Sequence, residues 1–126
     1  MNPYEVLPIF VFGTLRRGRE NHHCLAGRYE RCLVATLVDF RRAVARHGFP
    51  AVTPAIGDRV SGELFFLHPE QFLATLQECD LLEDLPVGEL VGEYYQRAKV
   101  KIDTAEGAFT AWAYIDPRTP APHLDE

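Results

Sequence analysis

Apolar residues run together or alternate with polar ones in short segments along most of the chain, a pattern typical of β-strands. Residues 8–12 (PIFVF) form an unbroken β-branched and aromatic run that ends at Gly13, which predicts a buried first strand leading into a tight turn. The pattern over residues 29–40 predicts a long strand, and its blurred alternation indicates that both faces are covered. Clearer alternation over residues 58–67 predicts a further strand.

One segment has the pattern of a helix. Pro69 suits the first helical turn, and the residues after it contain no glycine and no further proline as far as Glu83. At about 100° per residue, Glu83 falls within about 60° of the apolar side chains on one face, namely Phe72, Leu76 and Cys79. We therefore expect a helix over residues 69–83, with Glu83 at the end of its apolar stripe.

The remaining elements are shorter. Residues 47–51 predict an irregular edge strand, because Pro50 cannot donate a hydrogen bond to a neighbouring strand. Residues 85–93 contain one proline and two glycines and predict a loop. Residues 94–102 and 108–115 predict two strands joined by a tight turn.

The order of these elements indicates the fold class. A chain of 126 residues has the size of a single domain. We expect this domain to occupy residues 1–116, and residues 117–126 to form a mobile tail. Strands dominate, without the repeated strand–helix alternation of a doubly wound parallel sheet. The sequence therefore predicts an α+β fold in which a small mixed, barrel-like β-sheet is packed by one main helix.

Composition and charge disfavour several classes of protein. Lys and Arg number 13 while Asp and Glu number 18, and the resulting net charge of −5 opposes binding to nucleic-acid phosphates. The longest apolar runs fall short of the roughly 18 residues of a membrane span, and the N-terminus does not resemble a signal peptide. The 3 cysteines include no Cys-x-x-Cys pair, which suits a reducing compartment. We therefore expect a cytoplasmic protein that binds neither nucleic acid nor membrane.

The sharpest local feature is the turn Phe12-Gly13-Thr14-Leu15 after the first strand. A glycine at this point allows backbone N–H groups to converge and to hold an anion or a carbonyl oxygen. A turn with a purely structural role is the alternative. The glycine spacing also resembles a phosphate-binding loop, but Arg19 and Glu20 stand where that loop needs Lys and then Ser or Thr, which disfavours phosphate binding.

Glu83 is the main candidate for acid–base chemistry, because the end of an apolar stripe is a partly buried position. Burial disfavours the charged carboxylate and raises its pKa above the usual value of about 4.3, toward the range of a general acid or base near neutrality. The alternative is that the helix ends at Leu82 and that Glu83 is a solvated residue. Glu78 and Asp80 lie away from the centre of the stripe and are expected to be exposed charges.

Other polar residues leave two interpretations open. The adjacent His22 and His23 have no acidic or cysteine partner at ligand spacing, so we expect no metal site. The three arginines within residues 16–19 form a basic patch that either meets a substrate carboxylate or faces solvent. Tyr95 and Arg97 share the polar face of their strand and either line a pocket or face water.

A series of motifs makes the chain recognisable when the motifs are taken together. Each is weak alone, whereas their common order and spacing are specific. The series resembles the gamma-glutamylcyclotransferase-like family, of the gamma-glutamylamine cyclotransferase type, over about residues 9–116. The motifs are VFGTLRRG (residues 11–18) with Asn21-His22, Phe49-Pro50-Ala51, VSGELF (residues 60–65), CDLLE (residues 79–83), Tyr95-Gln96-Arg97 and AWAY (residues 111–114).

The resemblance implies a fold and a reaction. The family's fold is a small mixed barrel with flanking helices, and its members cyclise a gamma-glutamyl group to 5-oxoproline and release the attached amine or amino acid without a cofactor. By position, Glu83 would be the proton-transferring carboxylate. The residues expected to bind substrate are Phe12, Gly13, Thr14, Leu15 and Tyr95.

The chain departs from the family pattern in two places. Phe12 replaces a frequent tyrosine, so a phenolic hydroxyl is missing from the turn. Residues 84–93 form a longer link than usual after the catalytic carboxylate, which would reshape the mouth of the pocket. The expected partner is a small gamma-glutamyl compound, and the chain is expected to be a monomer or homodimer. The alternative functions are a non-catalytic module that binds a small metabolite in the same pocket and a purely structural interaction domain.

Overall fold

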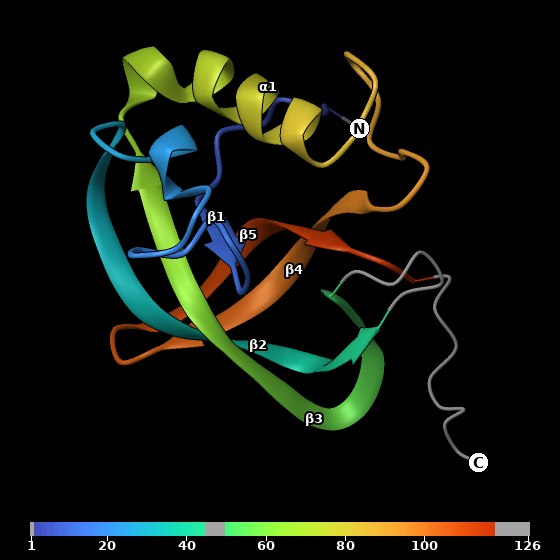
Figure 1. Ribbon diagram of the computed structural model, residues 1–126. Coiled ribbons are helices and arrows are strands. Elements are labelled where there is room, and N and C mark those ends of the chain that lie inside the picture. Colours follow the sequence, from blue (N-terminus) through green and yellow to red (C-terminus); the bar gives the residue numbers. More distant parts are fainter. Residues whose placement is uncertain (1, 45–49, 118–126) are drawn as a thin grey trace.

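The computed structural model describes residues 2–44 and 50–117. Its strands in chain order are β1 (Ile9–Val11), β2 (Tyr29–Val44), β3 (Pro50–Leu67), β4 (Gln96–Thr104) and β5 (Gly107–Ile115). They form a closed barrel in the order β1-β3-β2-β4-β5. Neighbouring strands pair antiparallel except β1 and β5, whose parallel pairing at Ile9 and Trp112 closes the barrel. In the described residues a single α-helix, α1 (Phe72–Leu82), lies beside the barrel at the top of Figure 1. The predicted α+β fold with a mixed, barrel-like sheet and one main helix is confirmed.

β2 and β3 form a long, bent hairpin that extends beyond the predicted strands. β2 continues past residue 40 to Val44, and the strand predicted at residues 58–67 is the second half of β3. The register shifts next to Asp39, whose φ is 65°. Such a bulge bends the strand and interrupts the alternation of apolar residues, so the pattern predicted shorter strands.

The edge strand predicted at residues 47–51 lies partly outside the described residues. Pro50 and Ala51 are described and open β3. Pro50 pairs with Val44 at the end of the ladder, where a missing N–H is tolerated. Residues 118–126, most of the predicted tail, also lie outside the described residues.

The predicted helix at residues 69–83 is divided into two parts. A 3₁₀ turn, η2 (Pro69–Gln71), precedes α1, and Glu83 directly follows the last α-helical residue. The expected apolar stripe is confirmed, because the side chains that form it are buried: Phe72, Leu76 and Cys79. Glu83 therefore lies at the C-cap of α1 rather than inside it.

Alternation along the strands divides the core into two layers. One cluster receives side chains from all five strands, including Phe10 and Leu64, and fills the barrel. The other packs α1 against the outside of the barrel and includes Ile9, Leu76 and Trp112. Because neighbouring residues of a strand point to opposite faces, Ile9 and Phe10 enter different layers. Both faces of β1 are thus buried, as its unbroken apolar run predicts.

The second half of the chain follows the predicted order with shifted bounds. The segment between α1 and β4 carries a single isolated bridge, between Val91 and Gln96, which confirms the loop predicted at residues 85–93. β4 begins at Gln96, so Tyr95 lies just before the strand. Gly107, with φ of 115°, opens β5 after the predicted tight turn.

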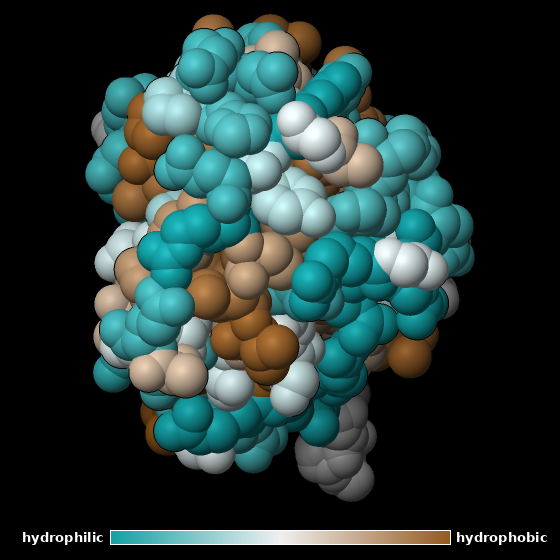
Figure 2. Space-filling view, turned by 90° about the vertical axis from the view of Figure 1, so that its left-hand side faces the viewer, coloured by the Kyte–Doolittle hydropathy of each residue, from teal (hydrophilic) through white to brown (hydrophobic). Residues whose placement is uncertain are grey.

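The surface mixes polar and apolar residues. Figure 2 shows apolar side chains near the middle of one face, with hydrophilic residues around them. Scattered exposed apolar residues such as Val34 and Ile56 are ordinary for a folded protein. In residues 2–44 and 50–117, no helix is long and apolar enough to cross a membrane.

Candidate active site

A cavity of about 500 Å³ opens beside the turn that follows β1. The turn contributes one wall, the residues after α1 contribute another, and the segment before β4 contributes a third. The structure thus brings together all the predicted site residues, although they are far apart in sequence. The predicted residues that line the cavity are Phe12, Gly13, Thr14, Leu15, Glu83 and Tyr95.

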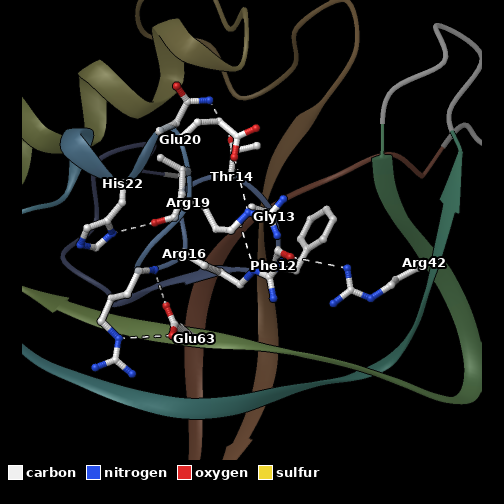
Figure 3. Close-up of polar contacts among 12 residues, drawn as sticks. Phe12, Gly13, Thr14, Arg16, Arg19, Glu20, His22, Arg42 and Glu63 are labelled. Atoms are coloured by element: carbon white, nitrogen blue, oxygen red, sulfur yellow. Dashed lines mark hydrogen bonds and ion pairs between the residues drawn. The ribbon is translucent and has the colours of Figure 1, made fainter.

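The loop after the turn binds two of the turn's carbonyl groups. Asn21 donates from its backbone N–H to the Thr14 carbonyl at 2.9 Å and from its side chain to Thr14 Oγ1 at 2.8 Å. His22 Nδ1 lies 2.9 Å from the Leu15 carbonyl (Figure 3). Since a carbonyl only accepts, this contact assigns the ring proton to Nδ1. Asn21 and His22 thus support the turn, a role that sequence spacing did not indicate.

The carbonyl groups of the turn accept hydrogen bonds, whereas its N–H groups donate none to the described residues. Arg16 donates to the Gly13 carbonyl from both its backbone N–H and its Nε, each at 3.1 Å (Figure 3). In the described part of the chain, the N–H groups of Gly13, Thr14 and Leu15 donate no hydrogen bond. Buried backbone donors are normally paired, so three N–H groups at a cavity wall are available to a bound acceptor.

β3 supports the turn from the side of the barrel. A β-carbon at Gly62 would lie 2.3 Å from the Val11 carbonyl oxygen, so glycine permits the close approach of β1. Next to it, Glu63 accepts from the Arg17 backbone N–H at 2.8 Å and from its Nε at 3.3 Å. This pairing holds Arg17 on β3, whereas the other two arginines of the predicted basic patch line the cavity.

Glu83 lies directly after α1 and is partly buried. Its backbone N–H donates to the Cys79 and Asp80 carbonyls, each at 3.1 Å, and closes the last turn. Burial, followed by the charges of Asp84 and Asp80, raises the pKa of its carboxyl from 4.5 to about 7. Among the described residues this carboxyl forms no hydrogen bond or ion pair. The helix does end at Leu82, but Glu83 is not the solvated residue of the alternative.

Tyr95 lines the pocket, one of the two positions left open for it. Its hydroxyl donates to the Pro50 carbonyl at 2.8 Å, and Pro50 lines the cavity too. Burial and the neighbouring Glu83 raise the pKa of Tyr95 to about 12. The hydroxyl therefore stays protonated and ties the start of β3 to the cavity wall.

Comparison with known proteins decides the family. The family model described as "Gamma-glutamyl cyclotransferase, AIG2-like" matches residues 9–126. The chain belongs to this family. A Vibrio cholerae protein provisionally named as a gamma-glutamylcyclotransferase is 33% identical over 113 residues, which cover 85% of this chain and 79% of that protein.

Solved structures of lower identity share the fold. YkqA from Bacillus subtilis superposes with a TM-score of 0.64 at 23% identity, covering 90% of this chain and 36% of YkqA. A gamma-glutamyl cyclotransferase superposes with a TM-score of 0.58 at 17% identity, covering 90% of this chain and 68% of that chain. This chain therefore spans about a third of YkqA and about two thirds of the second structure.

Phe12 forms part of the cavity wall of this family member. The guanidinium of Arg42 lies over the Phe12 ring, 5.5 Å from its centroid. Arg42 also donates to the Ser61 carbonyl at 3.0 Å and reaches the Phe12 carbonyl at 3.5 Å (Figure 3). Arg42 lines the cavity. It was not predicted from the sequence, because it lies in the part of β2 that extends beyond the predicted strand end at residue 40.

Two charged residues of this family member are placed differently from the prediction. Asp80 was expected to be exposed and is only 4% exposed, while Arg97 is 1% exposed and neither lines the cavity nor faces water. Arg97 donates to Asp80 at 2.8 and 3.0 Å, and the Tyr114 hydroxyl donates to Asp80 at 2.7 Å. The prediction was wrong because α1 packs over the face of the β4–β5 hairpin that carries Arg97, so this polar side chain is covered.

The described residues contain no cluster of side chains that could form a metal site. In residues 2–44 and 50–117, no group of three or more His, Cys, Asp or Glu side chains could hold a metal ion. The three cysteines, Cys24, Cys32 and Cys79, are free thiols. Burial raises the pKa of each thiol, so the thiols are neutral near pH 7.

Proposed function

We propose that the protein is a cyclotransferase that converts a gamma-glutamyl group to 5-oxoproline and releases the attached amine or amino acid. Family membership supports the reaction class. One observation supports the chemistry: Glu83, with a pKa of about 7, lines the same cavity as the turn whose three N–H groups have no acceptor among the described residues.

The reaction needs a proton carrier more than a nucleophile. The substrate's own α-amine attacks its γ-carbonyl carbon, a five-membered ring closes, and the bond from that carbon to the leaving nitrogen breaks. An intramolecular attack in good geometry has an effective concentration of roughly 10⁵ to 10⁸ M. The amine has a usual pKa of about 8 and is mostly protonated at pH 7. Glu83 would accept its proton and then give a proton to the leaving nitrogen.

The turn would hold the substrate and stabilise the reacting carbonyl. Backbone N–H groups that are fixed before the reaction stabilise a developing oxyanion, and the loss of one such donor costs roughly 3 kcal/mol. Gly13, Thr14 and Leu15 supply three such groups at the cavity wall. Arg16 and Arg42 on the same wall would attract the α-carboxylate of a gamma-glutamyl compound.

Glu83→Gln tests the proposal. The amide keeps the size of the side chain but cannot accept the proton, so we expect the rate of 5-oxoproline release to fall by about 10²- to 10⁴-fold. The assay incubates the protein with a gamma-glutamylamine, a gamma-glutamyl dipeptide and glutathione, and detects 5-oxoproline by chromatography. Glu78→Gln, an exposed carboxylate on the same helix, is the matched control and should keep wild-type activity.

Two outcomes would overturn the proposal. Wild-type rates in Glu83→Gln would exclude Glu83 as the proton carrier. Thermal stabilisation by 5-oxoproline without turnover of any panel compound would instead identify a non-catalytic binding module.

A further inference from the structure

The buried Arg97 is a charged group that the proposed mechanism does not use. The residue is 1% exposed. Its guanidinium lies 4.5 Å from the centroid of the Trp112 ring and binds Asp80 through two hydrogen bonds. A buried ion pair adds little net stability compared with apolar residues of the same size, because both ions lose their hydration. Stability alone therefore gives no reason for a charge pair at this place.

The location of Asp80 suggests what the pair does. Asp80 lies in the last turn of α1, and its carbonyl accepts from the N–H of Glu83 at 3.1 Å and of Leu85 at 2.8 Å. Its carboxylate is held from the other side by Arg97 of β4 and Tyr114 of β5. Asp80 thus joins the end of the helix both to the barrel and to the residues that follow the helix.

Tyr114 connects this network to the cavity. Its hydroxyl donates to Asp80 Oδ1 at 2.7 Å, and the residue lines the cavity together with Glu83. Burial, and to a lesser extent the charge and hydrogen bond of Asp80, raise the pKa of this phenol above the usual value and keep it protonated. One wall of the cavity is therefore fixed to the same carboxylate that anchors α1.

Glu83 has no such anchor of its own. Its carboxyl has no hydrogen-bond or ion-pair partner in the described residues, and the next residue, Asp84, has φ of 63°. The direction of the Glu83 side chain is therefore set by the backbone at the end of α1. We propose that Asp80, Arg97 and Tyr114 are positioning residues that hold the carboxyl group of Glu83 at the cavity, an inference that rests on the proposed function.

The charges around Glu83 make this role measurable. Burial, Asp84 and Asp80 raise the pKa of Glu83, and the nearby Tyr95 hydroxyl and Cys79 thiol are neutral at pH 7. Among the described residues, the cations on the cavity wall are Arg16, Arg19 and Arg42. Loss of the Asp80 charge removes one of the two anions and leaves Arg97 without its counterion, and both changes favour ionised Glu83.

Asp80→Asn is the main test. We expect kcat to fall at least about tenfold while KM changes less than about threefold, because Asp80 acts on Glu83 and not on substrate. The acid limb of the pH profile of kcat/KM should move to lower pH by more than about half a unit. The matched control is Asp103→Asn in the exposed pair of Arg59 and Asp103, which should change none of these quantities.

Tyr114→Phe is the milder variant and keeps the proposal testable if Asp80→Asn does not fold. It removes one hydroxyl and retains the ring and the ion pair, and we expect kcat to fall about fivefold. Wild-type kcat and an unchanged pH profile in this variant would overturn the positioning role. A fall in thermal stability with an unchanged pH profile in either variant would show a purely structural role.

Carbon-13 NMR titration of the Glu83 carboxyl separates this inference from the proposed function, because it needs no substrate. We expect a midpoint near 7 in the wild type and a lower midpoint in Asp80→Asn. If the wild type releases no 5-oxoproline, the proposed function fails and the titration alone decides whether Asp80 controls the surroundings of Glu83. Equal midpoints in the two proteins would overturn the inference.

Discussion

Asp80 and Glu83 lie three residues apart at the same end of α1, yet their carboxyl groups have opposite surroundings. Asp80 is 4% exposed and accepts three hydrogen bonds, from Arg97 and Tyr114. Glu83 is partly exposed to the cavity, forms no hydrogen bond or ion pair with the described residues, and has its pKa raised to about 7. Fully paired groups fix a structure, whereas an unpaired group in a cavity can exchange a proton.

The turn after β1 also contains paired and unpaired polar groups. Its carbonyl groups are bound by Arg16, Asn21 and His22, which fixes the direction of the peptide planes. Its N–H groups donate to no described residue. The paired half of the turn therefore holds the open half in place beside Glu83.

The largest effect on stability is expected at the buried ion pair of Asp80 and Arg97. Arg97→Met leaves the buried Asp80 carboxylate without its counterion, and we expect a loss of about 3–5 kcal/mol in the free energy of unfolding. Urea unfolding at pH 7 measures it. Arg17→Gln in the exposed pair with Glu63 is the control, and we expect a loss below about 1 kcal/mol. Similar losses in the two variants would contradict the distinction between the pairs.

Glu83→Gln should raise the free energy of unfolding, whereas Arg97→Met lowers it. The folded-state pKa of about 7 lies above the ordinary 4.5, so the wild type binds the proton more tightly when folded, and its stability falls as pH rises from about 4.5 to 7. Glutamine does not titrate. We expect Glu83→Gln to be more stable than the wild type by about 1–3 kcal/mol at pH 8, with a smaller difference at pH 5. Urea unfolding at both pH values checks this, and a difference that does not depend on pH would count against a buried, unpaired carboxyl.

The smallest effect on stability is expected at Gly13, where the turn faces the cavity. A β-carbon at Gly13 would meet no atom within 4 Å, so Gly13→Ala should change the free energy of unfolding by less than about 1 kcal/mol. Its methyl group would lie beside the cavity, and we expect a lower kcat/KM for gamma-glutamyl substrates. Gly62→Ala, which would clash with β1, is the contrast and should cost about 1–3 kcal/mol. Equal stability losses would show that the turn is packed rather than open.

Local patterns predicted much of the fold, and the residues proposed for the site line one cavity in the structure. The apolar run before Gly13, the stripe that ends at Glu83 and the closing hairpin all correspond to elements of the structure. The predicted roles of the site residues stay predictions until turnover is measured. The bent hairpin was underestimated because a bulge at Asp39 breaks the period of two.

Arg97 shows the limit of the pattern. Its strand alternates charged and apolar residues, which normally separates a wet face from a buried one. The alternation along the strand does not show that α1 packs on that face, nor that Asp80 of α1 pairs with Arg97. A charge can be buried when a partner comes from a distant segment. The local sequence therefore assigned Asp80 to solvent and left Arg97 either to a pocket or to solvent, and neither residue was expected to be buried in an ion pair.

By itself, the sequence determined the elements of this protein and the family to which it belongs, because both depend on the order and spacing of residues along the chain. The tertiary structure decided which polar groups find partners and which stay open. That outcome depends on distances between segments such as α1, β4 and the turn after β1, and it separates the anchored Asp80 from the available Glu83.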